Sequence, residues 1–204
     1  MAKAIGFYWT LPVPWAGFTK LSANVDEAAG QSRTIRYQRA LIRRHAKTHA
    51  MDLVHEAVFL EISPDRGSDA VKEALQDISA LAGANQATVL VVDFAAVQNW
   101  RSHQPLRDEA RHFGLTLEMV YPDEVMIDGR PFDPAPHFEN WRRRQAEWSA
   151  DKPVRLAEAV SRATELRFSG ASLAKTAATL NAEGLPSPTG RPWTADNLRK
   201  VLAS

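Results

Sequence analysis

The sequence contains no cysteine, which excludes disulfide bonds, thiolate metal ligands and a cysteine nucleophile. Its longest apolar run, near residues 87–92, is far shorter than the roughly 20 residues that span a bilayer. The N-terminus has no apolar segment followed by a small-residue cleavage site, so it does not resemble a secretory signal. With 45% hydrophobic and 24% charged residues, the composition predicts a soluble, cytoplasmic protein without a membrane partner.

A strong net charge is also absent, because the formal charge is only +1. The charge is nevertheless uneven along the chain: from Val154 onward, lysine and arginine exceed aspartate and glutamate by three. A local excess of this size can supply contacts to phosphate groups, although it specifies no partner by itself.

In the first half of the chain, segments with the hydrophobic pattern of strands alternate with segments that have the pattern of helices. Residues 4–10, 53–62, 87–93 and 115–121 are predicted strands, and residues 32–51, 68–82 and 105–113 are predicted helices, with Ser32 as an N-cap and Gly83 as a helix stop. Residues 17–30 show no clear period and are expected to form a loop. Strands that alternate with helices predict an α/β fold with an open, mostly parallel sheet wound by helices.

Composition changes after Pro122. Residues 131–136 hold three prolines, and a helix is predicted at 137–149 that carries Trp141, Trp148 and the run Arg142–Arg144. We therefore divide the chain into an α/β domain at 1–121, a connector at 122–152 and a small all-α domain at 153–204.

Three amphipathic helices are predicted in the last part, at 154–168, 172–182 and 195–203. Thr194 is a suitable N-cap for the final helix, with Asp196 in its first turn. Leu198 faces the predicted core, whereas Asn197, Arg199 and Lys200 point outward. Such a helix suits entry into the major groove of DNA.

Residues 169–204, SGASLAKTAATLNAEGLPSPTGRPWTADNLRKVLAS, resemble the DNA-binding domain of large serine recombinases. The likeness lies in the segment from Leu173 to Gly184, in Pro186–Gly190 and in the Trp193-Thr194 pair. It implies a helix-turn-helix domain that binds double-stranded DNA. The alternative is a three-helix protein-interaction domain without DNA affinity. The residues expected to bind DNA are Lys175, Thr176, Arg191, Trp193, Thr194, Asn197, Arg199 and Lys200.

The first half resembles the resolvase–invertase catalytic domain of the same family. AIGFYWT at 4–10, DRGSDAVKEALQDI at 65–78 and ATVLVVD at 87–93 follow the order of the family's motifs. In that family a serine hydroxyl attacks a DNA phosphodiester, and arginines stabilise the charge on phosphorus.

The resemblance places this arginine at Trp9 and the nucleophilic serine at Leu11. By the same resemblance, Glu61 and Arg66 are the candidate remnants of the family's polar site. The arginine cluster after the third strand is missing from residues 94–100. Substitute hydroxyls would have to come from Thr10, Ser22 or Ser32, of which Thr10 is expected on the strand face opposite Leu11.

Three other patterns have a functional and a structural interpretation. Arg33, Arg36, Arg39, Arg43, Arg44 and Lys47 crowd one predicted helix and form either a second phosphate-contacting surface or, as we favour, a solvated face. His45 and His49 have the spacing of a helical metal pair without a third ligand, and Asp93 could bind a divalent ion with Asp65 and Asp69. We expect no metal and no cofactor.

The sequence therefore predicts a DNA-binding protein derived from a serine site-specific recombinase, without strand-exchange activity, that acts as a regulator or accessory factor of a mobile element. The alternatives are an active but divergent recombinase and a protein-interaction adaptor. Whether the chain forms a homodimer is left open.

Overall fold

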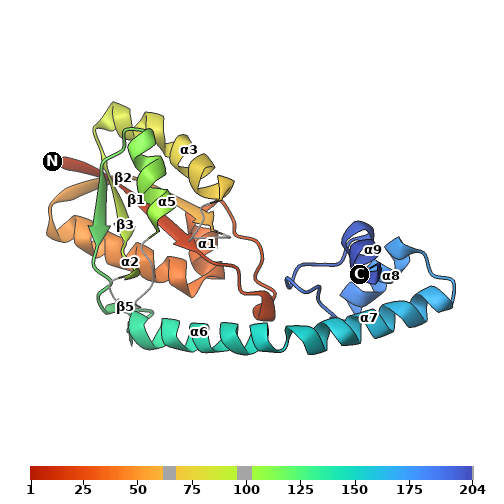
Figure 1. The fold of residues 1–204 in the computed structure, drawn as a ribbon. Coiled ribbons are helices and arrows are strands. Elements are labelled where there is room, and N and C mark those ends of the chain that lie inside the picture. The colour runs from red at the N-terminus through yellow and green to blue at the C-terminus, as the bar shows by residue number, and fades with distance from the viewer. Residues whose placement is uncertain (62–67, 96–102, 204) are drawn as a thin grey trace. The chain divides into compact units, whose positions relative to one another are not determined.

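The computed structural model describes residues 1–61, 68–95 and 103–203 (Figure 1). The chain forms two compact units. The first comprises residues 1–12 and 20–140, and the second comprises residues 13–19 and 141–204. The division between the two units falls between Asn140 and Trp141. The expected domain boundaries at 121 and 152 stay a prediction.

A four-stranded parallel sheet forms the centre of the first unit, as the alternating pattern predicts. Its strands lie in the order β2-β1-β3-β4. They are β1 (Ala2–Thr10), β2 (Met51–Leu60), β3 (Thr88–Val92) and β4 (Leu117–Val120). β1 is buried from Ala4 to Thr10 because it has neighbours on both sides and helices on both faces.

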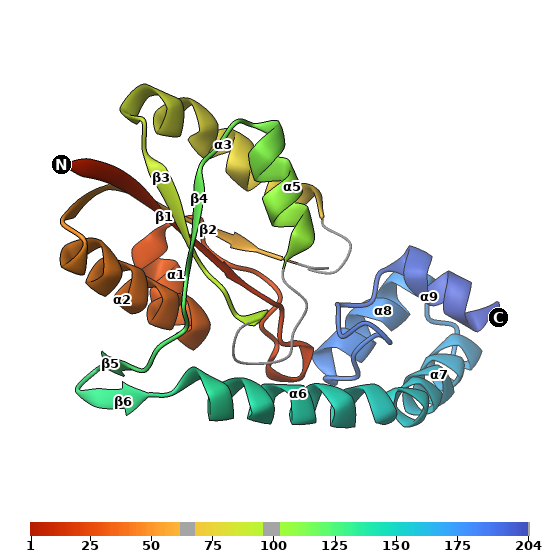
Figure 2. The ribbon, with the colours of Figure 1, turned by 60° about the vertical axis from the view of Figure 1, so that its left-hand side comes forward.

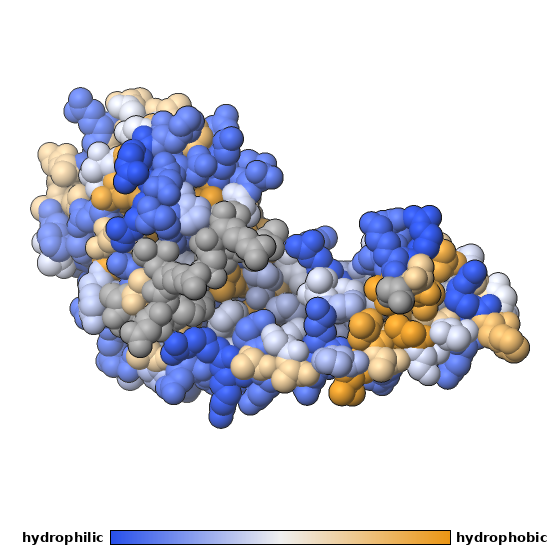
Figure 3. Space-filling view, viewed as in Figure 1, coloured by the Kyte–Doolittle hydropathy of each residue, from blue (hydrophilic) through white to orange (hydrophobic). Residues whose placement is uncertain are grey.

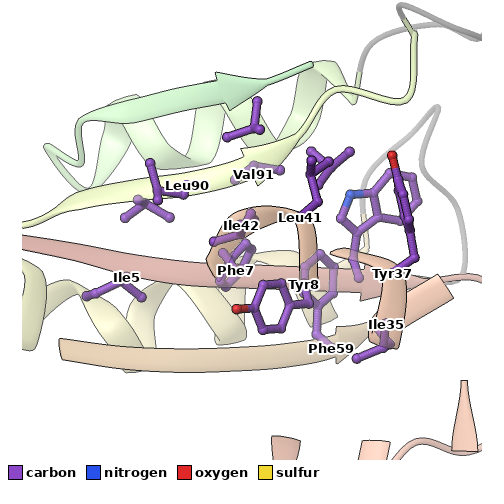
Figure 4. Close-up of a cluster of buried hydrophobic side chains, with 14 of the residues drawn as sticks. Ile5, Phe7, Tyr8, Ile35, Tyr37, Leu41, Ile42, Phe59, Leu90 and Val91 are labelled. Atoms are coloured by element: carbon purple, nitrogen blue, oxygen red, sulfur yellow. The ribbon is translucent and has the colours of Figure 1, made fainter. Parts of the chain in front are cut away.

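Helices α1 (Val25–Gln31) and α2 (Arg33–Thr48) cover one face of the sheet, and α3 (Asp69–Asn85) and α5 (Gln104–His112) cover the other (Figure 2). This distribution follows from right-handed crossovers, because the chain moves to one side from β1 to β2 and to the other side afterwards. The fold class predicted from the sequence is confirmed. The core lies between these layers, where Phe7, Tyr8, Leu41 and Leu90 are almost fully buried (Figure 4).

Two local expectations in this unit are wrong. The predicted loop at 17–30 contains α1, whose N-cap Asn24 accepts hydrogen bonds from the backbone of Asp26 and Glu27. The predicted stop at Gly83 lies inside α3, which continues to Asn85 and ends at Gln86 in the left-handed region, with φ of 51°. Gly83 faces open space, so nothing around it forces the helix to end there.

After β4 the chain forms a hairpin and a long helix. The hairpin strands are β5 (Val125–Ile127) and β6 (Arg130–Phe132), and the helix is α6 (Pro134–Ala150). Asp128 and Gly129 turn between the strands with φ of 52° and 74°. Two successive positive φ values are typical of the tightest hairpin turns, which explains the turn predicted at 127–130.

The second unit is helical, as the sequence predicts for its C-terminal part. It contains α7 (Lys152–Phe168), α8 (Leu173–Ala182) and α9 (Ala195–Leu202). Their small core consists of Ala159, Ala163, Ala177, Leu180, Trp193 and Leu198. A short 3-10 helix, η1 (Pro14–Ala16), belongs to the same unit. Among the described residues, no helix is long and apolar enough to cross a membrane.

Candidate nucleic-acid interface

Helix α9 begins with a reciprocal capping box. The Thr194 hydroxyl accepts a hydrogen bond from the Asn197 backbone at 3.2 Å, and the Asn197 side-chain oxygen accepts one from the Thr194 backbone at 2.8 Å. Two of the helix's unsatisfied backbone donors are therefore satisfied by side chains. The predicted cap at Thr194 is confirmed, and it fixes the direction in which the helix leaves the preceding connection.

Arg199 and Lys200 lie on the exposed side of α9, with 66% and 74% of their side-chain surface accessible. Both form ion pairs with Asp196, one turn earlier, and the Lys200–Asp196 distance is 2.9 Å. Hydrogen bonds from Lys200 and Arg199 lower the pKa of the Asp196 carboxyl. The helix therefore presents two exposed cations that share the Asp196 carboxylate as their ion-pair partner within the described part of the chain.

The other expected DNA-binding residues divide into exposed and buried ones. Lys175 and Arg191 are exposed. Thr176 is fully buried, and its hydroxyl donates to the Ser172 carbonyl at 2.9 Å. Trp193 is 3% exposed and its indole N–H donates to the Leu185 carbonyl at 2.8 Å. The sequence predicts all of these at one interface, but only the exposed ones face solvent.

Asn181 is a structural residue that the sequence analysis missed. Its side-chain amide donates to the Trp193 carbonyl at 3.0 Å and accepts from the Trp193 backbone N–H at 2.7 Å. It thereby fastens the connection between α8 and α9 to the end of α8. An Asn-x-x-Gly ending before a proline-rich connection was the available signal, because such an amide can take both backbone groups of an extended residue.

The carboxyl end of β1 holds the two positions where the resemblance expects an arginine and a serine. Trp9 is 5% exposed and its ring packs edge-on against Phe94 and His103. Leu11 packs partly buried against the core. Gln38 accepts from the Trp9 backbone N–H at 3.2 Å and donates to its carbonyl at 2.6 Å, which fixes the strand end.

Three hydroxyls lie near this strand end in sequence or in space. Thr10 and Ser32 are 5% and 7% exposed, and the Ser32 hydroxyl donates to the Thr10 hydroxyl at 3.4 Å. Ser32 also caps α2, as expected, by accepting from the Ile35 backbone. The Ser22 hydroxyl donates to Glu27 at 2.7 Å. Each hydroxyl is therefore engaged in an interaction within the unit.

Glu61 and His103 form a buried pair that the sequence analysis did not foresee. The Glu61 Oε2 and His103 Nε2 atoms are 3.1 Å apart, and the residues are 0% and 6% exposed. His103 Nδ1 accepts from the Leu106 backbone N–H at 3.2 Å, so Nε2 carries the proton that it donates to Glu61. This pair caps α5 and joins it to the end of β2. Arg66, the other expected remnant, lies outside the described residues.

The arginine-rich helix α2 makes ion pairs within the first unit. Arg39 and Arg43 both donate to Glu56 on β2, with Arg43 Nη2 at 2.6 Å from Oε2. Arg36 pairs with Asp128 at 2.6 Å, and Arg44 with Asp123 at 3.2 Å. Most of the side chains of this unit that Figure 3 shows in colour are hydrophilic. These four arginines are thus structural charges with acidic partners on neighbouring elements.

Glu56 provides a prediction about stability and pH. Burial raises the pKa of its carboxyl, but hydrogen bonds from Arg43, Tyr8 and Arg39 outweigh this and hold the pKa below the ordinary value of 4.5. The lowered pKa stabilises the fold above pH 4.5, and this contribution disappears as the pH falls through the folded-state pKa. We expect Glu56→Gln to lower the free energy of unfolding by about 2 kcal/mol at neutral pH, since it leaves two arginines without their carboxylate.

Urea unfolding monitored by circular dichroism at pH 7 and at about pH 3 checks this expectation. The difference between wild type and Glu56→Gln should shrink at the lower pH, because Glu56 is protonated in the unfolded chain there and its contribution falls as the pH approaches the folded-state pKa. A difference that is equal at both values would contradict the assignment.

The described residues of the two candidate metal sites have other partners in the structure. His45 Nε2 lies 2.6 Å from Glu118 Oε1, and the rings of His45 and His49 stack at 4.1 Å. Asp93 pairs with Arg107 at 3.6 Å, and Asp65 lies outside the described residues. In the part of the chain that the structure describes, no three His, Asp or Glu side chains could hold a metal ion together.

The tryptophans beside the Arg142–Arg144 run take part in packing. Trp141 contacts Trp15 with ring centroids 5.8 Å apart, and Arg155 lies over the ring of Trp148. Both contacts lie within the second unit. Trp141 and Trp148 are therefore packing residues of this unit.

Comparison with known proteins finds one match, to a protein-family model. No curated protein and no solved structure matches the chain. Residues 155–204, which contain nearly all of α7 and the whole of α8 and α9, match the family model described as Recombinase, so this part of the chain is similar to recombinases.

Proposed function

We propose that this chain is a DNA-binding protein derived from a serine site-specific recombinase, that it lacks strand-exchange activity, and that it acts as a regulator or accessory factor. Its partner is double-stranded DNA, bound by the second unit. The first unit then serves as an assembly surface for a second copy or for another protein.

The observation that carries the proposal is the exposed basic side of α9 within residues similar to recombinases. Arg199 and Lys200 are free of the core, and the Thr194 cap rigidifies the helix that presents them. A duplex phosphate can replace Asp196 as their partner without any change in the fold. Cations that exchange one anionic partner for another suit binding to DNA, where counterions are released.

In this proposal the exposed residues contact different parts of the DNA. Arg199 and Lys200 enter the major groove or contact its edge, and Lys175 and Arg191 contact the phosphate backbone on either side. Thr194 and Asn197 set the helix geometry, since both side chains are used in the capping box. Thr176 and Trp193 act indirectly, by holding α8 and the connection in place.

Loss of strand exchange is supported by the strand end of β1. Leu11 has no attacking oxygen and Trp9 has no charge. The neighbouring residues Thr10 and Ser32 are buried, and the Ser32 hydroxyl donates a hydrogen bond to the Thr10 hydroxyl. Removal of a nucleophile or of a main charge stabiliser lowers an enzymatic rate by orders of magnitude. The proposal therefore assigns DNA binding without cleavage.

Two measurements on the full chain test the proposal. Fluorescence anisotropy with duplexes from the chain's own genomic neighbourhood should show binding at low salt that weakens steeply as salt rises. Binding that is absent at low salt would favour the adaptor alternative, and footprinting on the same fragments would locate the site where binding is found.

The second measurement addresses cleavage. The wild type, Thr10→Val, Ser22→Ala and Ser32→Ala are incubated with the bound DNA and analysed on denaturing gels for covalent protein–DNA adducts. We expect no adduct with any of the four proteins. An adduct with the wild type that one variant abolishes would identify a displaced nucleophile and would establish the divergent recombinase instead.

A further inference from the structure

A cleft of about 650 Å³ lies within the second unit. Its walls are mainly apolar and include Trp15, Trp148 and Pro186, and its charged lining consists of Arg155, Arg191 and Glu158. The volume falls in the range of pockets for small organic ligands, which are typically apolar with a few convergent polar groups. Two arginines against one glutamate give the lining an excess of positive charge.

Arg155, one of the lining residues, has a hydrogen-bonding edge without a partner among the described residues. Its guanidinium lies over the ring of Trp148 at 3.4 Å, so its plane is fixed. The Nε and Nη2 atoms are buried and have no hydrogen-bond partner among the described residues. These two nitrogens form one side of the guanidinium, with two parallel N–H donors that match two oxygens of a phosphate or carboxylate group.

Buried donor atoms of a cation that lack a hydrogen-bond partner are costly, and they need an explanation in a folded protein. An oxyanion that accepts from both Nε and Nη2 would remove that cost. Because both atoms are shielded from solvent, binding has to be accompanied by a small shift of the surrounding side chains that uncovers the edge.

Part of the cleft lining is held by close backbone packing. Val13 and Phe18 exchange two backbone hydrogen bonds, of 2.7 and 3.1 Å, which close the loop that carries Trp15. Gly190 has a φ of 77°, and a Cβ at this position would overlap Pro14. A glycine is therefore required here for the connection before α9 to approach the loop, and the approach forms one end of the cleft.

We propose that this cleft binds a nucleotide, with the phosphate on the Nε–Nη2 edge of Arg155 and the base against the tryptophan walls. Arg191 at the rim is the second cation for a phosphate group that carries more than one negative charge. A flat base suits Trp15, because stacking on an aromatic ring tolerates any base. The nucleotide comes either from a free nucleoside monophosphate or from an unstacked residue of a DNA strand.

This inference goes beyond duplex binding by α9 and can fail independently of it, because the cleft residues lie outside that helix and only Arg191 is shared with the proposed duplex contacts. Adenosine monophosphate is titrated into the full chain, with tryptophan fluorescence and calorimetry as readouts. We expect saturable binding by the wild type, and a weakening of about 10- to 100-fold in Arg155→Gln and Arg155→Lys. Lysine retains the charge but lacks the two-donor edge.

Lys152→Gln is the matched control, because it removes one exposed charge from the same helix and should leave binding unchanged. Arg191→Gln at the rim gives a second variant that does not disturb the Arg155–Trp148 stack, with an expected loss of about threefold to tenfold. Adenosine and inorganic phosphate, titrated separately, should each bind at least about tenfold more weakly than the nucleotide.

A single-stranded tetranucleotide distinguishes the two sources. If it binds more tightly than adenosine monophosphate and loses affinity in Arg155→Gln, the natural ligand is a strand; if the mononucleotide binds more tightly, the ligand is free. No saturable binding of either probe up to about 1 mM, or equal binding by wild type and both Arg155 variants, would overturn the proposal.

Discussion

Replacement of Arg199 and Lys200 together by alanine is expected to lower duplex affinity at low salt by at least about tenfold, and to reduce the slope of log K against log salt by about 2. Both side chains are mostly exposed, and the ion pairs that they form among the described residues are with Asp196. Their removal therefore takes away phosphate contacts without creating a cavity. Anisotropy titrations over a salt series measure both quantities.

Two controls separate this effect from a general change in charge. Arg111→Ala with Lys72→Ala removes two exposed charges from the first unit, and Arg111 forms the same kind of (i, i+3) ion pair, with Asp108. This pair of changes should leave both affinity and slope nearly unaltered. Asp196→Asn should act in the opposite direction and tighten binding several-fold, because it releases both cations and removes a charge that repels phosphate.

If the Arg199–Lys200 double variant retains DNA as well as the wild type does, α9 is not the contacting element. If no duplex binds either protein, the three helices are an interaction module. Tighter DNA binding by Asp196→Asn also distinguishes a direct effect from destabilisation, because a loss of fold cannot raise affinity.

The sheet, the order of its helices and the capped final helix could be predicted because each depends on nearby residues. Residues 87–93 form a nearly continuous apolar run, and only a strand covered on both faces accommodates such a run in a chain of this kind. Thr194 and Asn197 are three positions apart, so their reciprocal hydrogen bonds are a local property of the sequence.

Helix α1 was missed for a local reason as well. Its apolar residues are few, since only Ala28 and Ala29 are buried, and a glycine lies near its end. Hydrophobic periodicity is therefore weak over seven residues. The signal that remained was Asn24 followed by Asp26 and Glu27, a capping side chain followed by two acidic residues in the first turn.

The partners of the α2 arginines could not be predicted, because they lie far away in the sequence. Glu56 is on β2, and Asp123 and Asp128 follow β4. A helical projection shows only that these arginines occupy the surface of α2. Whether they meet phosphate, solvent or carboxylates depends on which strands and turns pack beside the helix, and the pattern of one helix holds no such information.

Trp193 illustrates the same limit at the candidate site. A tryptophan before a capped helix looks accessible in the sequence, and it was assigned to the DNA interface. Its burial depends on Asn181 and Leu185, which bind its backbone and its indole N–H across the connection from α8. Trp193 is therefore expected to determine whether the second unit folds, and only through folding whether it binds DNA.

Replacement of Trp193 by alanine is expected to lower the free energy of unfolding of the second unit by about 3–5 kcal/mol, the usual cost of deleting a buried large aromatic ring. The core of α7, α8 and α9 contains six buried residues, and small domains have little stability to lose. The unit should thus be largely unfolded at room temperature, which far-UV circular dichroism and amide hydrogen exchange of α7–α9 will show.

Trp193→Phe is the variant to compare with Trp193→Ala. It keeps most of the ring volume but removes the indole N–H, so the Leu185 carbonyl loses its 2.8 Å hydrogen bond, at a cost of about 1–3 kcal/mol. We expect this variant to remain folded and to bind duplex DNA with nearly the affinity of the wild type. A Trp193→Ala protein with intact α7–α9 and lost DNA binding would mean that the ring itself contacts DNA. Joint loss of helix and affinity in Trp193→Ala, with both retained in Trp193→Phe, would instead make Trp193 the residue on which the geometry of α9 depends.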